Sequence, residues 1–267
     1  MKPTPNKPVF LSAFVAISLG CILLAGTVSA LTDTVPNAVD SRKQKDDETR
    51  AVAALEKSGI PLQRDPRGHV RWIEATEHEF TDEALGWLPR LPHLEWLEIG
   101  GGKVTPSSMA HLKDCPSLRR LYMHDINLSG DELTWLSSLS RLEALSLQRT
   151  GIDGKCLKNI SAADTLTVLN LSGNKIANDD MDQIARLKGL EVLALADTGI
   201  TSTGIAKLEG MARLNELNLM NCLLLDSDLE YFLSMPNLRI VYAKGCDISD
   251  MAIASVVARF PMLAIFR

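Results

Sequence analysis

The side chains best suited to catalysis or metal binding are scattered along the chain. Five histidines occur among the 267 residues, and none stands at a metal-ligand spacing from a cysteine or a carboxylate. They are His69, His78, His93, His111 and His124. The sequence also lacks a G-x-S-x-G nucleophile turn, a phosphate-binding loop and an H-E-x-x-H zinc motif. We therefore predict a protein that is not an enzyme and that needs neither a metal nor a cofactor.

One acidic run, residues 178–182, has the oxygen-bearing side chains of a calcium loop. It lacks the glycine and the distal glutamate that such a loop requires. Its acids stand at the predicted start of a short helix, where negative charge favours the helix dipole. We interpret this run as structural.

Aromatic and basic residues at a fixed spacing suggest a different chemistry, the binding of another macromolecule. Trp72 and Trp96 are 24 residues apart, and Arg120 follows after 24 more. Tryptophan, tyrosine and arginine are the residue types that anchor protein interfaces. The net charge of −5 argues against nucleic acid as the partner. The predicted partner-binding residues are Trp72, Trp96, Glu98, Arg120, Tyr122 and His124.

This spacing belongs to a repeat that organises most of the chain. Residues 166–176 read LTVLNLSGNKI, and the pattern occurs in eight copies of 24 residues from Val70, with a partial ninth at Leu263. We number positions in each repeat from offset 0, which is Val70 in the first copy. Apolar residues at offsets 3 and 5 predict a strand with one buried face. Apolar residues at offsets 10, 15 and 18, after a Thr, Ser or Asp at offset 11 in six copies, predict a short capped helix.

The repeats resemble the 24-residue leucine-rich repeats of exported bacterial proteins, whose pattern is LxxLxxLxLxxTxITDxGLxxLxxL. Residues 190–208, LEVLALADTGITSTGIAKL, match it best. The resemblance covers about residues 70–267 and implies an α/β fold, a right-handed solenoid of horseshoe type. Its parallel sheet lines the concave face and its short helices the convex face. It also implies binding of other macromolecules, through partners that differ between members.

The sequence departs from the family pattern at offset 8 of the first three repeats. His78, Gly102 and Ile126 replace the asparagine or threonine that normally bonds the inner turns. We expect these N-terminal repeats to be less regular than the others.

In this fold, offsets 2, 4 and 6 point outward from the concave side of the sheet. The predicted partner-binding residues then form one patch over the first three strands. The alternative is that the N-terminal cap or residues 31–50 fold over the tryptophans, covering Trp72 more than Trp96. The middle of the same face is small and apolar, with Ala144, Val168, Val192, Ala194 and Ala196.

Residues 1–30 have the features of a leader. Lys2 and Lys7 precede an apolar run over residues 9–26, and Val28 and Ala30 provide small residues for cleavage. This predicts a signal peptide, but the run is also long enough for an uncleaved membrane anchor through residues 9–29. Both alternatives place the remaining chain outside the cytoplasm, whether secreted, periplasmic or anchored facing outward.

We predict a linker at 31–41, an N-terminal cap at 42–69 and the repeat domain at 70–267. The cap combines a helix, starting near Asp40 and ending at Gly59, with a hairpin around the turn at residues 65–68. Val52 and Leu55, with Ala51, form its expected buried stripe. At the other end, residues 262–267 form a short strand that either caps the sheet or pairs with another chain; we predict a monomer.

Four cysteines follow the leader, namely Cys115, Cys156, Cys222 and Cys246. Cys222 and Cys246 occupy offset 8 of successive repeats, and neighbouring strands lie about 4.8 Å apart. That separation permits a disulfide. The alternative is a pair of buried thiols that take the asparagine or threonine role in the inner turn.

The predicted function is that of a non-enzymatic, extracytoplasmic module that binds a protein or an envelope ligand through its concave face. Two alternatives share the sequence features. One is a membrane-anchored scaffolding protein of the cell envelope, and the other is an inhibitor of a secreted enzyme.

Overall fold

A computed structural model of the chain describes residues 38–76, 80–130, 133–160 and 165–267, with side chains from residue 42 onward. The predicted leader and most of the predicted linker lie outside these residues, as does His78. Residues 42–267 form one compact unit. No helix in the described part of the chain combines the length and the apolar character needed to cross a bilayer.

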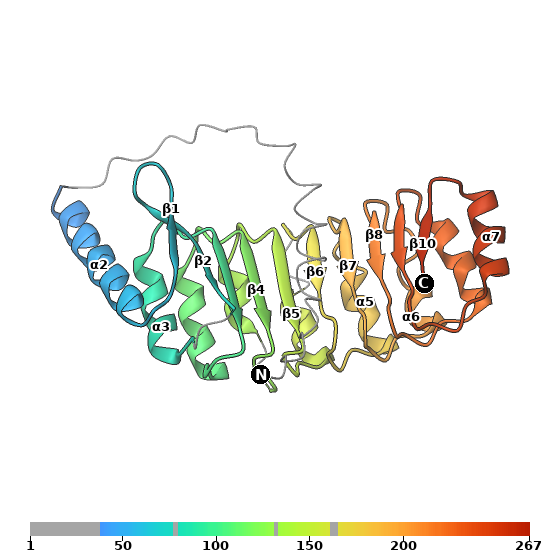
Figure 1. Cartoon of the computed structure of the whole chain (residues 1–267), viewed down its shortest axis with the longest axis horizontal. Helices are drawn as coiled ribbons and strands as arrows, with labels where there is room; N and C mark the ends of the chain where they lie inside the picture. The colour runs from blue at the N-terminus through green and yellow to red at the C-terminus, as the bar shows by residue number, and fades with distance from the viewer. Residues whose placement is uncertain (1–37, 77–79, 131–132, 161–164) are drawn as a thin grey trace, which may run out of the picture. The chain divides into compact units, whose positions relative to one another are not determined.

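In the described part of the chain, ten strands form one sheet in which each strand neighbours the next in sequence (Figure 1). β1 pairs antiparallel with β2, and every later pair is parallel. The strands are β1 Leu62–Arg64, β2 Val70–Ala75, β3 Trp96–Gly100, β4 Arg120–His124, β5 Ala144–Gln148, β6 Val168–Asn170, β7 Val192–Ala194, β8 Glu216–Asn218, β9 Ile240–Tyr242 and β10 Ala264–Phe266. The predicted parallel sheet with an N-terminal hairpin is confirmed.

The 24-residue period sets the strand register. Trp72 pairs with Trp96, Trp96 with Arg120 and Arg120 with Ala144. Equivalent offsets therefore lie side by side, and the residues at offsets 3 and 5 bury their side chains in one continuous core. A single coil has no partner for this face, so stacking supplies the burial that stabilises each one.

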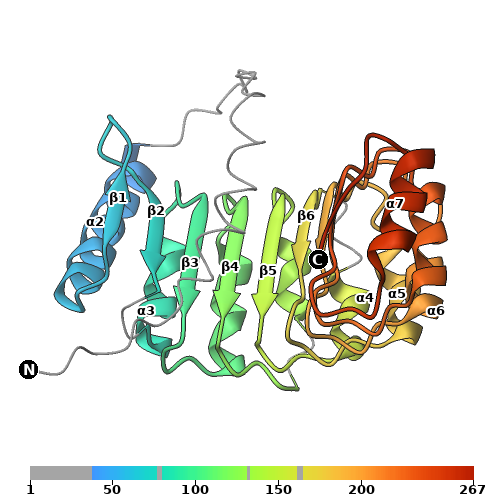
Figure 2. The ribbon, with the colours of Figure 1, turned by 45° about the vertical axis from the view of Figure 1, so that its right-hand side comes forward.

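Short helical segments cover the other face of the sheet (Figure 2). The α-helices are α2 Ala38–Lys57, α3 Asp82–Trp87, α4 Leu157–Ile160, α5 Met181–Ile184, α6 Ser202–Ala206 and α7 Asp250–Arg259. The 3₁₀ segments are η1 Leu88–Arg90, η2 Pro106–Asp114, η3 Thr134–Ser138, η4 Gly154–Cys156, η5 Asn178–Asp180 and η6 Asp226–Ser234. Offsets 15 and 18 are buried throughout except for the half-buried Ile253.

The helix starts only partly follow the prediction. Thr81 and Ser249 each accept a hydrogen bond from the backbone N–H three residues ahead, as N-caps do. Thr105 does not cap its own helix. Its N–H and its hydroxyl both donate to the carboxylate of Asp82, at 2.7 and 2.9 Å, so it ties two coils together instead.

A bridge of the same kind recurs toward the C-terminus. Asn178 accepts from the N–H of Thr201 and donates to its hydroxyl, while the N–H and hydroxyl of Ser249 donate to Asp226. In the acidic run, Asp180 accepts from the N–H of Ala177 at 2.9 Å, which is the structural role predicted for these acids.

Offset 7 has a left-handed backbone in every repeat from the second onward. Its φ angles run from 52° at Arg149 to 82° at Gly245. Glycine, asparagine and aspartate tolerate this conformation, but arginine rarely adopts it. Arg149 is held there by two hydrogen bonds to the carboxylate of Asp125, at 2.6 and 2.7 Å.

Polar side chains at offset 8 bond the inner turns of the later repeats. The members of this inner-turn ladder are Thr150, Asn174, Thr198, Cys222 and Cys246. Each donates to a backbone carbonyl at offset 5 of its own or the preceding repeat. Cys222 and Cys246 are unpaired thiols that donate to the carbonyls of Leu195 and Leu219. The structure therefore shows the thiol alternative and not the disulfide.

The cap differs in detail from the prediction. α2 begins at Ala38, inside the predicted linker. Ala51 and Leu55 are completely buried, whereas Val52 is only half-buried, so the stripe is centred on Ala51 rather than Val52. Gly59, with φ 76°, ends the helical turn as predicted.

Candidate binding surface

Six predicted partner-binding residues share the outer face of β2, β3 and β4, the face away from the core. We call this set the aromatic patch, and it comprises Trp72, Trp96, Glu98, Arg120, Tyr122 and His124. The register places Trp72 beside Trp96, Glu98 beside Tyr122, and His124 beside Gly100. The structure thus brings together residues that are up to 52 positions apart in sequence.

Ring contacts hold the centre of the aromatic patch in place. The rings of Trp96 and Tyr122 meet edge to face, with centroids 5.4 Å apart. The guanidinium of Arg120 lies 5.2 Å from the centroid of the Trp96 ring, which is a cation–π distance. These contacts fix large amphipathic side chains before any partner arrives, which lowers the entropy lost on binding.

The side chains of the aromatic patch differ in how much of their surface is exposed to solvent. Trp72 is 37% exposed, and Trp96, Arg120, Tyr122 and His124 are half-buried. β1 lies next to β2, with Gln63 opposite Trp72, yet Trp72 remains the most open of the aromatic side chains here. Residues 42–69 therefore do not cover Trp72 more than Trp96, and residues 31–37, which the alternative from the sequence also named, lie outside the described residues.

Glu98 is the buried member of the aromatic patch, with 6% exposure. Burial raises the pKa of its carboxyl, and the neighbouring carboxylate of Glu74 raises it further. His124 and a hydrogen bond from Trp96 oppose that rise only in part. Burial also raises the pKa of Tyr122. A carboxylate in this position interacts strongly with any charge brought next to it.

His124 depends on a glycine that sequence reasoning overlooked. A Cβ at Gly100 would lie 2.1 Å from the imidazole, so glycine leaves room for the ring in its present position. The Nδ1 atom of His124 lies 3.0 Å from the carboxylate of Asp125. Hydrogen bonds from Arg149 and His124 hold the pKa of Asp125 at about 2. Among the described residues, the buried Nε2 of His124 has no hydrogen-bond partner.

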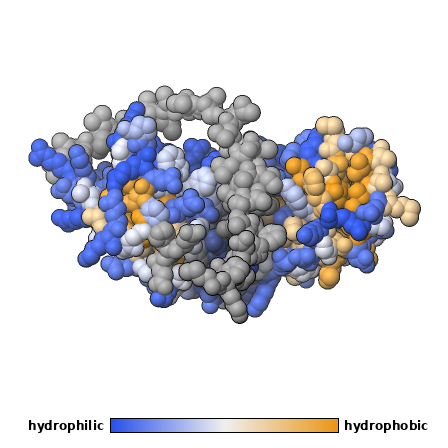
Figure 3. Space-filling model, viewed as in Figure 1, coloured by the Kyte–Doolittle hydropathy of each residue, from blue (hydrophilic) through white to orange (hydrophobic). Residues whose placement is uncertain are grey.

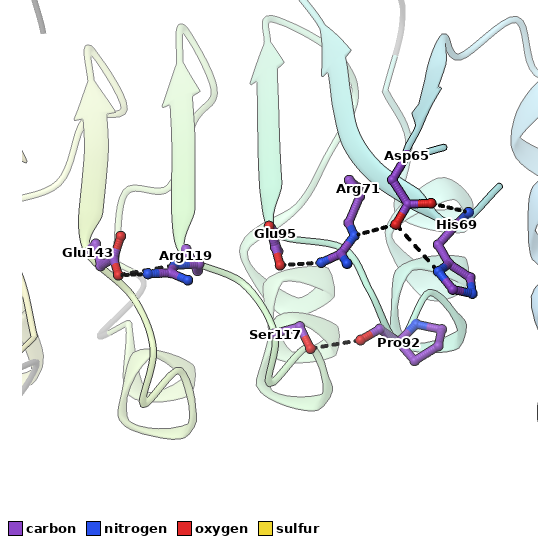
Figure 4. A network of polar contacts seen from close by, with 8 residues as sticks. All are labelled: Asp65, His69, Arg71, Pro92, Glu95, Ser117, Arg119 and Glu143. Carbon is purple, nitrogen blue, oxygen red and sulfur yellow. Dashed lines mark hydrogen bonds and ion pairs between the residues drawn. The ribbon is translucent and has the colours of Figure 1, made fainter. Parts of the chain in front are cut away.

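Ion pairs form a row at the N-terminal ends of the strands that carry the aromatic patch (Figure 4). Arg71 pairs with Glu95, and Arg119 pairs with Glu143, each across one repeat. Arg71 also donates to Asp65 in the cap hairpin at 3.1 Å. The sequence alone could have indicated these ion pairs, because charges of alternating sign occupy offset 1 of the first four repeats.

The row of ion pairs continues into the hairpin turn of the cap, where Arg71 donates to Asp65. Burial alone would raise the pKa of Asp65, but hydrogen bonds from Arg71 and from the backbone N–H groups of His69 and Arg67 hold it at about 2. Asp65 is therefore ionised at neutral pH and joins the cap to the first repeat strand. No group of three or more His, Cys, Asp or Glu side chains in the described ranges is arranged to hold a metal ion.

Comparisons with known proteins agree with this architecture. A family model described as "Leucine rich repeat" matches residues 164–224. The structure of internalin C2 from Listeria monocytogenes aligns with a TM-score of 0.59 at 22% identity, over 73% of this chain and 80% of that one. A comparison with curated proteins gave no match.

Two further solved structures are similar to this chain. A leucine-rich repeat protein from Leptospira interrogans aligns with a TM-score of 0.50 at 23% identity, over 68% of this chain and 45% of that one. The PEPR1–AtPEP1 complex aligns with a TM-score of 0.52 at 17% identity, over 76% of this chain and 32% of that one. With its stacked 24-residue coils and parallel sheet, the chain is a protein of leucine-rich repeat fold.

Proposed function

We propose that this protein binds a polypeptide partner through the aromatic patch, outside the cytoplasm and without catalysing a reaction. The observation that carries the proposal is the packing around Trp96, which has Tyr122 at its edge, Arg120 over its ring and the exposed Trp72 beside it. Neighbouring aromatic side chains on an outer face are costly to leave in water, and such clusters mark interaction sites.

The fold supports a binding role. Parallel strands hold the aromatic patch on a rigid base, and ion pairs and ring contacts restrict its side chains. Leucine-rich repeat proteins typically serve as binding modules, and one similar structure is a complex between PEPR1 and AtPEP1. The leader predicted at residues 1–30 supports the extracytoplasmic location.

The proposal is tested by alanine substitutions at matched positions. Trp96→Ala and Tyr122→Ala are expected to weaken binding of a purified partner by about 2 kcal/mol or more each, roughly thirtyfold, because both lie at the centre of the patch. Tyr242→Ala is the control, since Tyr242 occupies the same offset as Tyr122 on the outer face of β9 and stacks on Phe266. Equal binding by all three variants, each with unchanged circular dichroism, would contradict the proposal.

N-terminal sequencing of the protein recovered from its native host tests the location. A chain that starts at Leu31 would support export with cleavage of the leader. A chain that retains residues 9–29 would support a membrane tether instead. Recovery of the uncleaved protein from the soluble cytoplasmic fraction would contradict both.

A second candidate function, assembly into a scaffold, is favoured by the C-terminal repeats. Figure 3 shows apolar residues over the C-terminal repeats. The large apolar side chains that are exposed in this part of the chain include Leu223, Leu225, Met251, Met262 and Phe266. Self-association through this surface would raise the mass measured by light scattering with concentration. Met251→Ser, at 80% exposure, would then lower the mass. A constant monomeric mass would exclude this candidate.

A further inference from the structure

We propose that the aromatic patch receives a lysine or arginine side chain of the partner, which packs on Trp72 and directs its charge to Glu74 and Glu98. This inference rests on the proposed function and names the chemistry that the partner must carry. Four observations support it: the placement of the two carboxylates, their lack of a cation, the burial of Glu98 and the open ring of Trp72.

The two carboxylates occupy neighbouring positions on adjacent strands. Glu74 of β2 pairs in register with Glu98 of β3, both at offset 4 on the outer face. Adjacent strands lie about 4.8 Å apart, so the two negative charges are held close together. Like charges at facing positions of a sheet are destabilising, and a cation bound between them would remove that cost.

Neither carboxylate forms an ion pair with any residue that the structure describes. This distinguishes them from the acids nearby, because Glu95, Glu143 and Asp125 each pair with an arginine. His124 is the one base that acts electrostatically on Glu98 among the described residues, and it offsets the rise in the pKa of Glu98 only in part. Arg120, on the outer face of the next strand, has its guanidinium over the ring of Trp96. Glu74 and Glu98 therefore form a pair of neighbouring carboxylates without an arginine or lysine partner from the described part of the chain.

Burial makes Glu98 an effective receptor for a cation. At 6% exposure its carboxylate has already lost most of its water in the free protein. An incoming ammonium or guanidinium group then gains a strong charge interaction while Glu98 loses little further hydration. Glu74 is exposed and contributes at the rim of the site, where solvent weakens its effect.

The tryptophans provide the surface along which the rest of the side chain packs. Arg120 on Trp96 shows that the patch already accommodates a guanidinium against an indole ring. Trp72, in register with Trp96 and 37% exposed, has the same ring chemistry available to a partner. An acidic partner would meet two carboxylates against the single charge of Arg120, so charge complementarity favours a basic segment.

The probe is a random 12-residue peptide library displayed on phage and selected against the full protein. Selected peptides are resynthesised, and their affinities are measured by calorimetry against the unmodified protein and its variants. We expect enrichment of lysine or arginine, and at least tenfold weaker binding when that residue is changed to glutamine. Glu98→Gln is expected to cause a similar loss and Glu74→Gln a loss of two- to threefold.

Glu216→Gln is the matched control. Glu216 lies on the outer face of β8, is also 6% exposed, and has a pKa raised by burial alone, with no carboxylate beside it in register. This substitution should leave peptide affinity unchanged. Glu98→Gln should also keep or raise the thermal unfolding midpoint at neutral pH, because the amide removes a buried negative charge and its repulsion from the exposed Glu74.

The outcomes separate this inference from the proposed function. Peptides that require Trp96 but bind equally well to Glu74→Gln and Glu98→Gln would overturn the cation site and leave the patch as a binding surface. Selection of acidic peptides that require Arg120 would do the same. If no selected peptide depends on Trp96, both the inference and the proposed function fail.

Discussion

The first three repeats and the later ones share one leucine frame but place their polar side chains differently. From Thr150 onward, offset 8 carries hydroxyl, amide or thiol groups that bond the inner turns. In the second and third repeats the same offset is Gly102 and Ile126, which have no polar side-chain atom. The outer face differs as well, with aromatic and charged groups over β2–β4 and smaller residues such as Ala144 and Ala194 over β5–β7.

This difference shows that the stacking of a coil on its neighbours and the chemistry of its outer face can vary independently. In the third repeat an apolar side chain, Ile126 at 2% exposure, takes the place of the polar group at offset 8. At Gly102 the chain passes so close to the preceding coil that a Cβ would lie 2.8 Å from the carbonyl oxygen of Phe80. Stacking therefore does not require the inner-turn ladder, and the outer face of these coils is free to specialise.

The largest loss of stability is expected from removing the side chain at the centre of the inner-turn ladder. Asn174 donates to the carbonyls of Leu147 and Leu171 at 2.6 and 3.0 Å and accepts from the N–H of Thr150 at 3.1 Å. Asn174→Ala leaves the carbonyl of Leu171 and the N–H of Thr150 buried without these partners, while the carbonyl of Leu147 keeps only the hydroxyl of Thr150. We therefore expect a loss of about 2–4 kcal/mol of stability, measured as a lower urea midpoint.

Asn218→Ala is the control for that substitution. Asn218 lies on the outer face of β8 and accepts one hydrogen bond, from the N–H of Met220. Its loss should cost about 1 kcal/mol. All four tryptophans lie at or before Trp135, so fluorescence reports the N-terminal half and circular dichroism reports the whole chain. An equal loss for both variants would show that the ladder has no special role.

A smaller loss of stability is expected on acidification, and it should be confined to the N-terminal half of the solenoid. All five histidines lie at or before His124. The rings of His69 and His93 are 4.0 Å apart, and burial, His69 and Arg71 lower the pKa of His93, against the opposing charges of Glu48 and Asp65. The folded state therefore resists protonation of His93 more than the unfolded chain does.

Because the pKa of His93 is lower in the folded state, acidification reduces the stability of the protein. Above about pH 6.5 His93 is neutral in both states and costs nothing, and stability falls as pH drops through that value toward the lowered pKa of the folded state. We expect the fluorescence-detected urea midpoint to decrease between pH 7 and pH 5, and His93→Gln to reduce the decrease. A variant with an unchanged pH response would show that the stacked pair has no part in it.

The smallest effect is expected at the thiols of the ladder. Cys222 is buried and donates to the carbonyl of Leu195, as the hydroxyl of Thr198 does one repeat earlier. Cys222→Thr retains a donor of similar size and should change stability by less than about 1 kcal/mol. Cys222→Ala removes the donor and should cost about 1 kcal/mol. A larger loss for threonine than for alanine would mean that packing, and not donation, sets the preference.

The fold could be predicted because the repeat fixes which side chains face inward. Leucine spacing gave the strand order, the register and the core, and the Asp-Pro-x-Gly turn gave the cap hairpin. The finer contacts depend on which residues meet across neighbouring coils. Thr105 bonds Asp82 of the previous coil instead of capping its own helix, and that choice is not visible in either repeat alone.

The candidate surface was predictable in position but not in internal geometry. Alternation placed the aromatic patch on the outer face. It gave no indication that Glu98 would be 6% exposed while Glu74 at the same offset stays open. That difference arises because Glu98 has Trp96, Tyr122 and His124 around it, whereas Glu74 lies on the first repeat strand. The fit of His124 over Gly100 likewise depends on two adjacent coils together.

The left-handed residue at offset 7 has a consequence for the length of the molecule. Because each coil from Gly101 to Gly245 turns at the same point with the same backbone, one coil can replace another as a module. Deleting residues 166–189 would shorten the solenoid by one strand separation, about 4.8 Å, and rejoin matching turns. The number of coils therefore sets the distance between the aromatic patch and the apolar C-terminal repeats.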